Sequence, residues 1–161
     1  MSFLVRKAKQ LDVSDLAKAW YDMSLEIWRK HKCPIYKPKP KEEFVKAASE
    51  IFSRKLRSNK YLIFVAIENG TLAGFVVARV DHYVPSVFVQ EKLIYVEKLF
   101  VAKRARRKGV GSVLMEKILS EAKKKHVRIV YLSTEIDDRN LAFYGKLGFE
   151  RYQYKLMKMI K

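Results

Sequence analysis

The chain is poor in cysteine, proline and glycine, with one, four and six of them in 161 residues, and it has half as many acidic as basic side chains. Because a single cysteine, Cys33, cannot form an internal disulfide, a disulfide-stabilised small domain is excluded. No apolar run approaches the roughly 20 residues of a membrane span or the apolar core of a signal peptide. These absences predict a cytoplasmic protein with no membrane partner.

Residues that bind metals are also sparse. His31, His82 and His126 are scattered without the spacing of a ligand set, and the chain has no CxxC pair. We therefore expect no structural or catalytic metal.

Positive charge is what the chain has in excess. Thirty-four Lys and Arg against 17 Asp and Glu give a net charge of +17 at pH 7. Such an excess attracts polyanions and predicts an acidic or nucleoprotein partner. Basic residues are spread over every segment, however, and solvated helix faces such as 123–125 explain many of them equally well. No helix-turn-helix, zinc finger or aromatic RNA-binding strand motif accompanies them.

Length and a hydrophobic content of 49% predict one α/β domain over residues 1–161 with a substantial core. The Asn69-Gly70 pair joins two β-rich runs and predicts a hairpin. The order of elements indicates a mixed sheet, with antiparallel hairpins first and a crossover connection later. The hydrophobic period predicts strands over 3–8, 61–68, 71–83, 91–101, 128–134 and 149–159, and helices over 13–30, 41–57, 109–125 and from 137 or 138 to 148.

The loop between the strand over 91–101 and the helix over 109–125 is the most informative segment. It carries cations at positions 103, 104, 106, 107 and 108, followed by Gly109 and Gly111. Without a Cβ at either glycine, consecutive N–H groups at the helix start can converge on the oxygens of a pyrophosphate, and the helix dipole favours negative charge there. The alternative interpretation is a merely solvated basic turn.

Two motifs in this half of the chain resemble those of the Gcn5-related N-acetyltransferase (GNAT) superfamily. Arg106, Gly109 and Gly111 match its acetyl-CoA signature of Arg or Gln, two residues, Gly, one residue, and Gly or Ala. The segment 140–149 resembles the family's second motif of Asn, then Ala, then Tyr, then Leu-Gly-Phe. The resemblance covers essentially all of the chain. It implies a single-domain GNAT-like α/β fold, a mixed central sheet of six to seven strands with flanking helices, and acetyl-CoA as cosubstrate.

The resemblance also implies which residues hold acetyl-CoA. Backbone N–H groups from 107 to 112 would bind the pyrophosphate, and the main chain of the strand over 99–101 would pair with the pantetheine arm and stabilise the oxyanion. Asn140 would bind a pantetheine amide or a phosphate, unless it only makes a hydrogen bond at the helix start. The candidate cofactor-binding residues are Leu99, Phe100, Val101, Arg106, Arg107, Lys108, Gly109, Val110, Gly111, Ser112 and Asn140.

Two residues are the candidate catalytic groups. Tyr144, four residues after Asn140 and on the same helical face, carries a phenol that is protonated at neutral pH and can protonate the departing thiolate. Its alternative role is aromatic packing. Glu97 interrupts an otherwise apolar strand, in a segment that resembles diamine and polyamine acetyltransferases, and is the candidate general base through water. Its alternative role is a salt bridge to a lysine on the next strand.

The function predicted is acetyl-CoA-dependent transfer of an acetyl group to a primary amine of a small molecule, peptide or protein. The alternative is a catalytically silent, basic acyl-CoA or nucleic-acid binding module on the same fold. Asp22 and Glu26, together with Asp137 and Asp138, are candidate carboxylates for a cationic amine, although solvated charges explain them equally well. Family members often form dimers, so a homodimer is a further prediction, and the Cys33 thiol is interpreted as a bystander.

Overall fold

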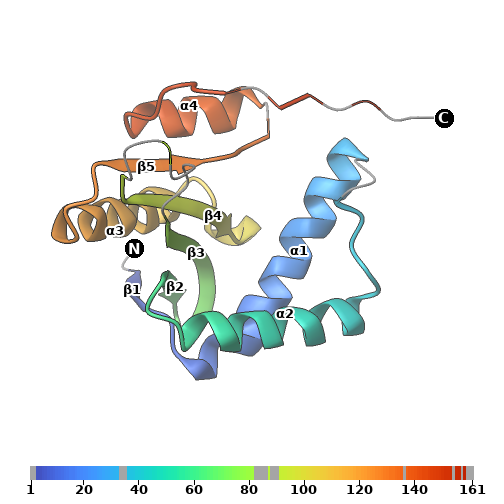
Figure 1. Ribbon diagram of the computed structural model, residues 1–161. Helices are drawn as coiled ribbons and strands as arrows, with labels where there is room; N and C mark the ends of the chain where they lie inside the picture. Colours follow the sequence, from blue (N-terminus) through green and yellow to red (C-terminus); the bar gives the residue numbers. More distant parts are fainter. Residues whose placement is uncertain are drawn as a thin grey trace.

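The computed structural model describes residues 3–32, 36–81, 87, 91–135, 137–153, 155, 156 and 158. These residues form one five-stranded sheet and four α-helices (Figure 1). The strands are β1 (Leu4–Lys7), β2 (Tyr61–Glu68), β3 (Thr71–Asp81), β4 (Leu93–Val101) and β5 (Ile129–Leu132), and the helices are α1 (Val13–His31), α2 (Lys41–Leu56), α3 (Val110–Lys124) and α4 (Asp138–Lys146), with short 3-10 turns η1 (Gln10–Asp12) and η3 (Lys103–Ala105).

The strands lie in the order β1-β2-β3-β4-β5, with the first four antiparallel and β5 parallel to β4. The crossover that a parallel pair requires is α3. The hairpin turn has left-handed backbone at both Asn69 (φ 50°) and Gly70 (φ 73°), as the two-residue turn of twisted strands demands. The predicted hairpin and the mixed sheet are therefore confirmed.

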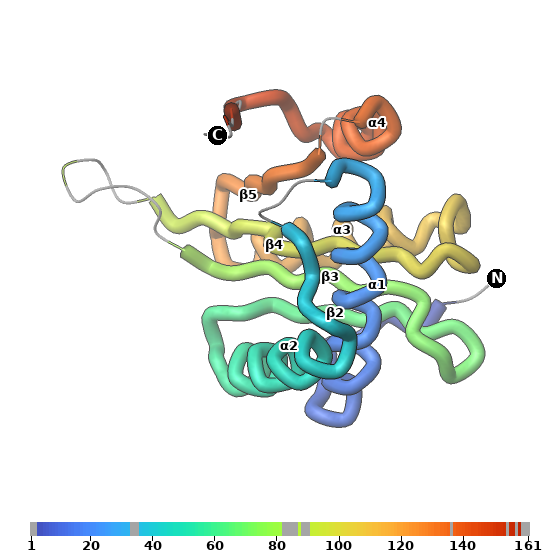
Figure 2. Tube along the Cα trace, turned by 90° about the vertical axis from the view of Figure 1, so that its right-hand side faces the viewer, coloured from blue at the N-terminus to red at the C-terminus, as the bar shows by residue number. Residues whose placement is uncertain are grey.

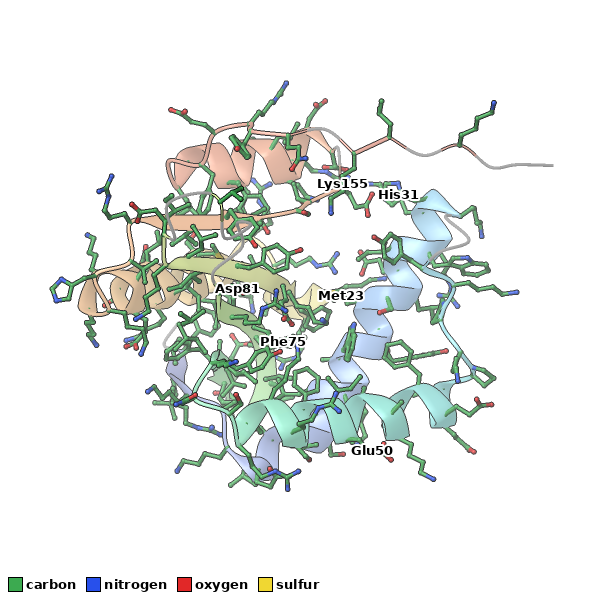
Figure 3. The ribbon with its side chains drawn as sticks, viewed as in Figure 1. Met23, His31, Glu50, Phe75, Asp81 and Lys155 are labelled. Atoms are coloured by element: carbon green, nitrogen blue, oxygen red, sulfur yellow. The ribbon has the colours of Figure 1, made fainter. Side chains whose placement is uncertain are left out.

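Helices cover both faces of the sheet (Figure 2). On one face Phe64 and Val76 belong to a buried cluster with side chains of α3. On the other face Val65 and Phe75 pack with α1 and α2, and Phe75 is labelled in Figure 3. A sheet buried on both faces accounts for the nearly continuous apolar runs of β2 and β3. Burial on two sides also fixes the register, because a shift by one residue would exchange the two cores.

Strand β4 leaves β5 halfway along its length. It pairs with β5 only from Leu93 to Val96, whereas its pairing with β3 continues to Val101. The register between β3 and β4 shifts here: Val96 pairs with Ala78, and Lys98 pairs with the adjacent residue, Val77. Glu97, between them, has no partner on β3 and is the extra residue of a β-bulge. The outer edge of β4 after Val96 is thus open to a ligand, directly before the loop that leads to α3.

The expectation of a closing strand over 149–159 is wrong for the part that the structure describes. Residues 149–153, 155, 156 and 158 belong to no strand, and positions 154, 157 and 159 lie outside the described residues. Tyr152 and Leu156 are each 96% exposed, so the alternating pattern here has no buried face to pair against. The described chain has five strands instead of six or seven.

Other expectations also fall outside the described residues. Cys33, His82 and the end of the strand predicted over 71–83 belong to segments that are not described. Among the helices that are described, none is long and apolar enough to cross a membrane.

Candidate functional site

The N-terminus of α3 presents free backbone donors at the open edge of β4. Gly109 has a left-handed backbone (φ 84°) and starts the helix, whose first bond runs from the N–H of Val113 to the carbonyl of Gly109 at 3.1 Å. The N–H groups of Val110, Gly111 and Ser112 therefore have no carbonyl partner within the helix. Such N–H groups at the positive end of a helix dipole are donors that can bind an anion, and the pyrophosphate site expected from the loop sequence stays a prediction.

The two glycines of this loop are needed for different reasons. A Cβ on Gly109 would meet nothing within 4 Å, so the requirement there is the left-handed backbone. A Cβ on Gly111 would lie 3.2 Å from Cζ of Phe143, which belongs to α4. Gly111 thus lets α3 pack closely against α4, a role that the motif did not indicate.

Carboxylates of the chain itself hold the cations of the loop. Arg106 donates to Glu26 on α1 through both Nη atoms, at 2.8 and 2.7 Å, and through Nε to the carbonyl of Val101 at 3.1 Å. This hydrogen bonding lowers the pKa of Glu26 and raises that of Arg106. Lys108 lies 3.4 Å from Glu68. Glu26, a candidate carboxylate for the acceptor amine, is instead paired with Arg106 of the loop before α3.

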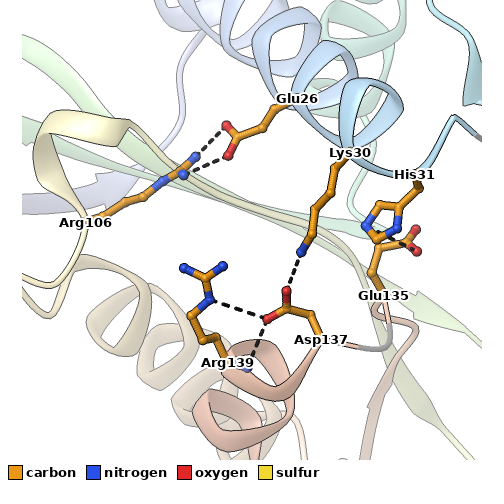
Figure 4. Close-up of polar contacts among 7 residues, drawn as sticks. All are labelled: Glu26, Lys30, His31, Arg106, Glu135, Asp137 and Arg139. Carbon is orange, nitrogen blue, oxygen red and sulfur yellow. Dashed lines mark hydrogen bonds and ion pairs between the residues drawn. The ribbon is translucent and has the colours of Figure 1, made fainter.

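Further ion pairs join α1 to the start of α4 (Figure 4). Lys30 pairs with Asp137, whose other oxygen accepts the N–H of Arg139 at 2.9 Å and caps α4 as predicted. The hydrogen bond from Lys30 is the main cause of the lowered pKa of Asp137. His31 lies 3.9 Å from Glu135. Asp137 is therefore also engaged within the chain, while the other two candidate carboxylates, at 22 and 138, are exposed.

Helix α4 places Tyr144 against the core that contains α3. Its ring packs edge-on against Phe143 and Phe149, with centroids 5.0 and 5.8 Å away. Burial raises the pKa of Tyr144 to about 12. Its hydroxyl makes no hydrogen bond to any residue that the structure describes. Tyr144 therefore packs as an aromatic residue and also keeps a protonated, unengaged phenol. Asn140, one turn earlier, is exposed.

Glu97, the bulged residue of β4, lies among three cations. It forms ion pairs with Lys55 of α2, with Arg79 of β3 at 3.7 Å and with Lys98 at 3.9 Å. Only 11% of its side chain is exposed. A salt bridge to a neighbouring strand was the alternative role for Glu97, and its ion pair with Arg79 of β3 is of that kind. Its main partner, however, is Lys55 on a helix, and its side chain lines a cavity.

The cavity lies between α1, α2, the segment 36–39 and β4, and it has a volume of about 490 Å³. Its walls are mainly apolar, and its described carboxylates are Glu97 and Glu135. Its lining includes Trp20, Met23, Phe44, Ile51, Glu97 and Lys98.

Lys98 is a site residue that the sequence analysis missed. Its side chain is 17% exposed, and its Nζ lies 4.1 Å from the ring centroid of Trp20 on α1. The pKa of Lys98 is lowered to about 8, mainly by burial; the charge of Lys55 contributes to the lowering and the charge of Glu97 opposes it. Two consecutive charged residues inside an apolar strand were the available signal, because a bulge turns both toward the same face.

Comparison with known proteins identifies the family. The model of the acetyltransferase (GNAT) family matches residues 18–149. The chain belongs to this family. The family expected from the two motifs is thereby confirmed.

Individual relatives of this GNAT chain agree with the family match. An uncharacterized N-acetyltransferase of Methanocaldococcus jannaschii is 25% identical to the chain. The match covers 92% of this chain but only 61% of the length of that relative. The chain shares its fold with two crystal structures. One is a tetramutant of the BH1408 protein of Bacillus halodurans, with a TM-score of 0.83 and 19% identity over 98% of this chain and 99% of that one. The other is a predicted acetyltransferase of Clostridium acetobutylicum with acetyl-CoA, with a TM-score of 0.74 and 18% identity over 98% of this chain and 96% of that one.

Proposed function

We propose that this GNAT chain transfers the acetyl group of acetyl-CoA to a primary amine. The observation that carries the proposal is the departure of β4 from β5 after Val96, next to the free amides of α3. An extended pantetheine arm can pair with an open strand edge in the manner of an added strand, while a helix N-terminus binds its pyrophosphate. Similarity to a structure determined with acetyl-CoA supports the same cosubstrate.

In this proposal the cofactor lies along the candidate residues at 99–101 and 106–112, with Asn140 nearby. The N–H groups of Val110, Gly111 and Ser112 bind the pyrophosphate, and main-chain groups near Leu99 bind the pantetheine arm and the oxyanion. Because Arg106 and Lys108 are already paired with carboxylates, the backbone supplies most of the phosphate contacts and these two cations supply the surrounding field.

The chemical step needs a base on one side of the thioester and an acid on the other. Glu97, which lines the cavity, accepts a proton through water from the substrate ammonium, which becomes a neutral amine. The amine nitrogen then forms a bond to the carbonyl carbon, the carbon–sulfur bond breaks, and Tyr144 gives its proton to the departing thiolate. The second proton that the nitrogen loses as the amide forms passes through water to the Tyr144 phenolate and restores the phenol. A phenol with a pKa of about 12 is fully protonated at neutral pH and can donate when sulfur becomes negative.

Calorimetric titration with acetyl-CoA and desulfo-CoA tests the cofactor site. Gly109→Leu places a side chain in front of the helix amides and is expected to weaken acetyl-CoA binding at least tenfold, about 1.4 kcal/mol. Gly70→Leu is the matched control, since Gly70 also has a left-handed backbone with nothing near its missing Cβ but lies in the β2–β3 turn. Equal affinity in both variants would contradict the assignment of the loop.

The silent binding module is the second candidate, and the net charge of +17 is what favours it. Strongly salt-dependent binding of a short oligonucleotide, without binding of acetyl-CoA, would support that module. Salt-tolerant one-to-one binding of acetyl-CoA would support the enzyme. The acidic or nucleoprotein partner and the homodimer stay predictions in either case.

A further inference from the structure

We infer that the acceptor is an apolar α-amino acid, whose amine lies at Glu97 and whose carboxylate is bound by Lys98. The inference rests on the proposed acetyl transfer and names the substrate class of that same site. Where Glu97 and Lys98 line the cavity, the described chain places three cations, Lys55, Arg79 and Lys98, against two carboxylates, Asp81 and Glu97.

Lys98 is the cation of this group that lacks a close acceptor. Lys55 is paired with Glu97, and Arg79 donates to Asp81 at 2.6 Å. Lys98 Nζ makes no hydrogen bond to any described residue, and its closest carboxylate oxygen is 3.9 Å away on Glu97. The Lys98 side chain is only 17% exposed, so its ammonium has lost part of its hydration, and no hydrogen bond to a described residue replaces it. The ring of Trp20 offsets only part of that loss.

A carboxylate bound in the cavity would supply the missing acceptors. It would form a charge-assisted hydrogen bond with an ammonium that is already desolvated and positioned by Trp20, so the ligand would gain binding energy without ordering a mobile side chain. The same carboxylate would balance the excess positive charge among these side chains. A polycationic amine would gain neither, because it has no carboxylate for Lys98, and Lys55 and Lys98 repel its additional positive charges.

The bulge explains why one small ligand can meet both groups. In a regular strand Glu97 and Lys98 would project from opposite faces, whereas both line this cavity. Their charged atoms lie 3.9 Å apart. An α-amino acid carries its ammonium and carboxylate on a single carbon, in the complementary arrangement. The ammonium then faces the candidate base, where the proposed reaction needs it.

The cavity walls select the rest of the ligand. Trp20, Met23, Phe44 and Ile51 offer apolar surface, and the volume of about 490 Å³ falls within the range of small-molecule sites. Burial of an apolar side chain against these residues contributes to binding in proportion to the area that is removed from water. The apolar walls, together with the charges of Glu97 and Lys98, fit a zwitterion that carries an apolar side chain.

The test compares acetyl transfer to L-phenylalanine, phenethylamine and spermidine. Phenethylamine keeps the apolar body and the amine but lacks the carboxylate. We expect kcat/KM for phenylalanine to exceed that for phenethylamine about tenfold or more, and Lys98→Met to remove this preference. Lys46→Met, an exposed site on α2 with the same charge change, is expected to leave the preference intact. Equal rates for the two amines, or a preference that survives Lys98→Met, would overturn the inference.

A binding measurement keeps the test independent of turnover. N-acetyl-L-phenylalanine and N-acetylphenethylamine are titrated into the protein with CoA, while the pKa of Lys98 is followed by NMR of its side chain. Binding of the carboxylate ligand should raise that pKa, and the ligand without a carboxylate should not. No difference between the two would contradict the acceptor assignment alone. Loss of acetyl-CoA binding, with no transfer to any amine, would instead refute the proposed function.

Discussion

Arg106, in the loop before α3, donates to both carboxylate oxygens of Glu26 on α1, at 2.8 and 2.7 Å (Figure 4). With the pair of Lys30 and Asp137, this contact joins α1 to the cofactor loop and to α4. The Arg106 and Glu26 side chains are 41% and 40% exposed, so their pair contributes at most about 1 kcal/mol to stability. The pair matters more for the proposed binding of acetyl-CoA, because Glu26 holds Arg106, the arginine of the signature motif.

Glu26→Gln is therefore expected to tighten the binding of acetyl-CoA. The substitution removes a negative charge beside the phosphate site and releases Arg106, so we expect the Kd to fall about two- to fivefold at low salt and less at high salt. Calorimetry at two salt concentrations measures this. Glu43→Gln, which removes a charge from the exposed pair between Lys39 and Glu43 at the start of α2, is the control. Weaker binding in Glu26→Gln would mean that Glu26 orients Arg106 for the phosphate.

Tyr144→Phe is expected to lower kcat about 100-fold while leaving the Kd of acetyl-CoA unchanged, because it removes the proton donor and keeps the ring. Stability should hardly change, since the hydroxyl has no hydrogen bond within the described chain. Steady-state kinetics and thermal unfolding check the two parts. Tyr152→Phe, at a side chain that is 96% exposed, is the control. An unchanged kcat would leave Tyr144 as a packing residue only.

The sequence was sufficient for most elements of the fold, because their signals are local. The left-handed pair at Asn69 and Gly70 makes the turn that this dipeptide favours, and continuous burial follows the apolar runs of β2 and β3. The exception is the segment 149–159. Its alternation is as regular as in a true strand, but strand formation depends on a partner edge and a buried face, which a local pattern does not specify.

The site divides in the same way. The proposed anion site at 109–112 is contiguous in sequence, so spacing and residue type are enough to propose it. The base of the cavity brings Lys55 of α2 to Glu97 and Lys98 of β4, and their contact depends on the packing of a helix on a sheet. The bulge at Glu97 depends on the register between β3 and β4. Neither relationship has a signature in a single sequence.

The close approach of Gly111 and Phe143 predicts that the effect of Gly111→Ala on stability depends on the residue at position 143. Gly111→Ala adds a Cβ at 3.2 Å from the ring and should lower the free energy of unfolding by about 1 kcal/mol, after the gain in helix propensity. In a Phe143→Leu background the same change should be neutral or stabilising. Chemical denaturation of the four proteins measures the coupling.

Gly145→Ala on α4 is the control for this cycle. A Cβ there meets nothing within 4 Å, so the substitution should stabilise the protein by about 0.5–1 kcal/mol through helix propensity alone. Additive effects of Gly111→Ala and Phe143→Leu would show that the two helices adjust without strain, and that Gly111 serves only the cofactor.

The buried ammonium of Lys98 makes stability depend on pH. Below pH 8 the group is charged in both the folded and the unfolded chain. Between its folded pKa of about 8 and the ordinary value of 10.5, unfolding takes up a proton, so stability rises with pH through this window. The rise is on the order of 2–3 kcal/mol at 1.36 kcal/mol per pKa unit. Denaturation curves from pH 7.5 to 10.5 should therefore show the free energy of unfolding of the wild type rising by that amount relative to Lys98→Met. The free energy of unfolding of Lys46→Met should follow that of the wild type over the same range. A constant difference between wild type and Lys98→Met would show that Lys98 is solvated as an ammonium in the folded protein.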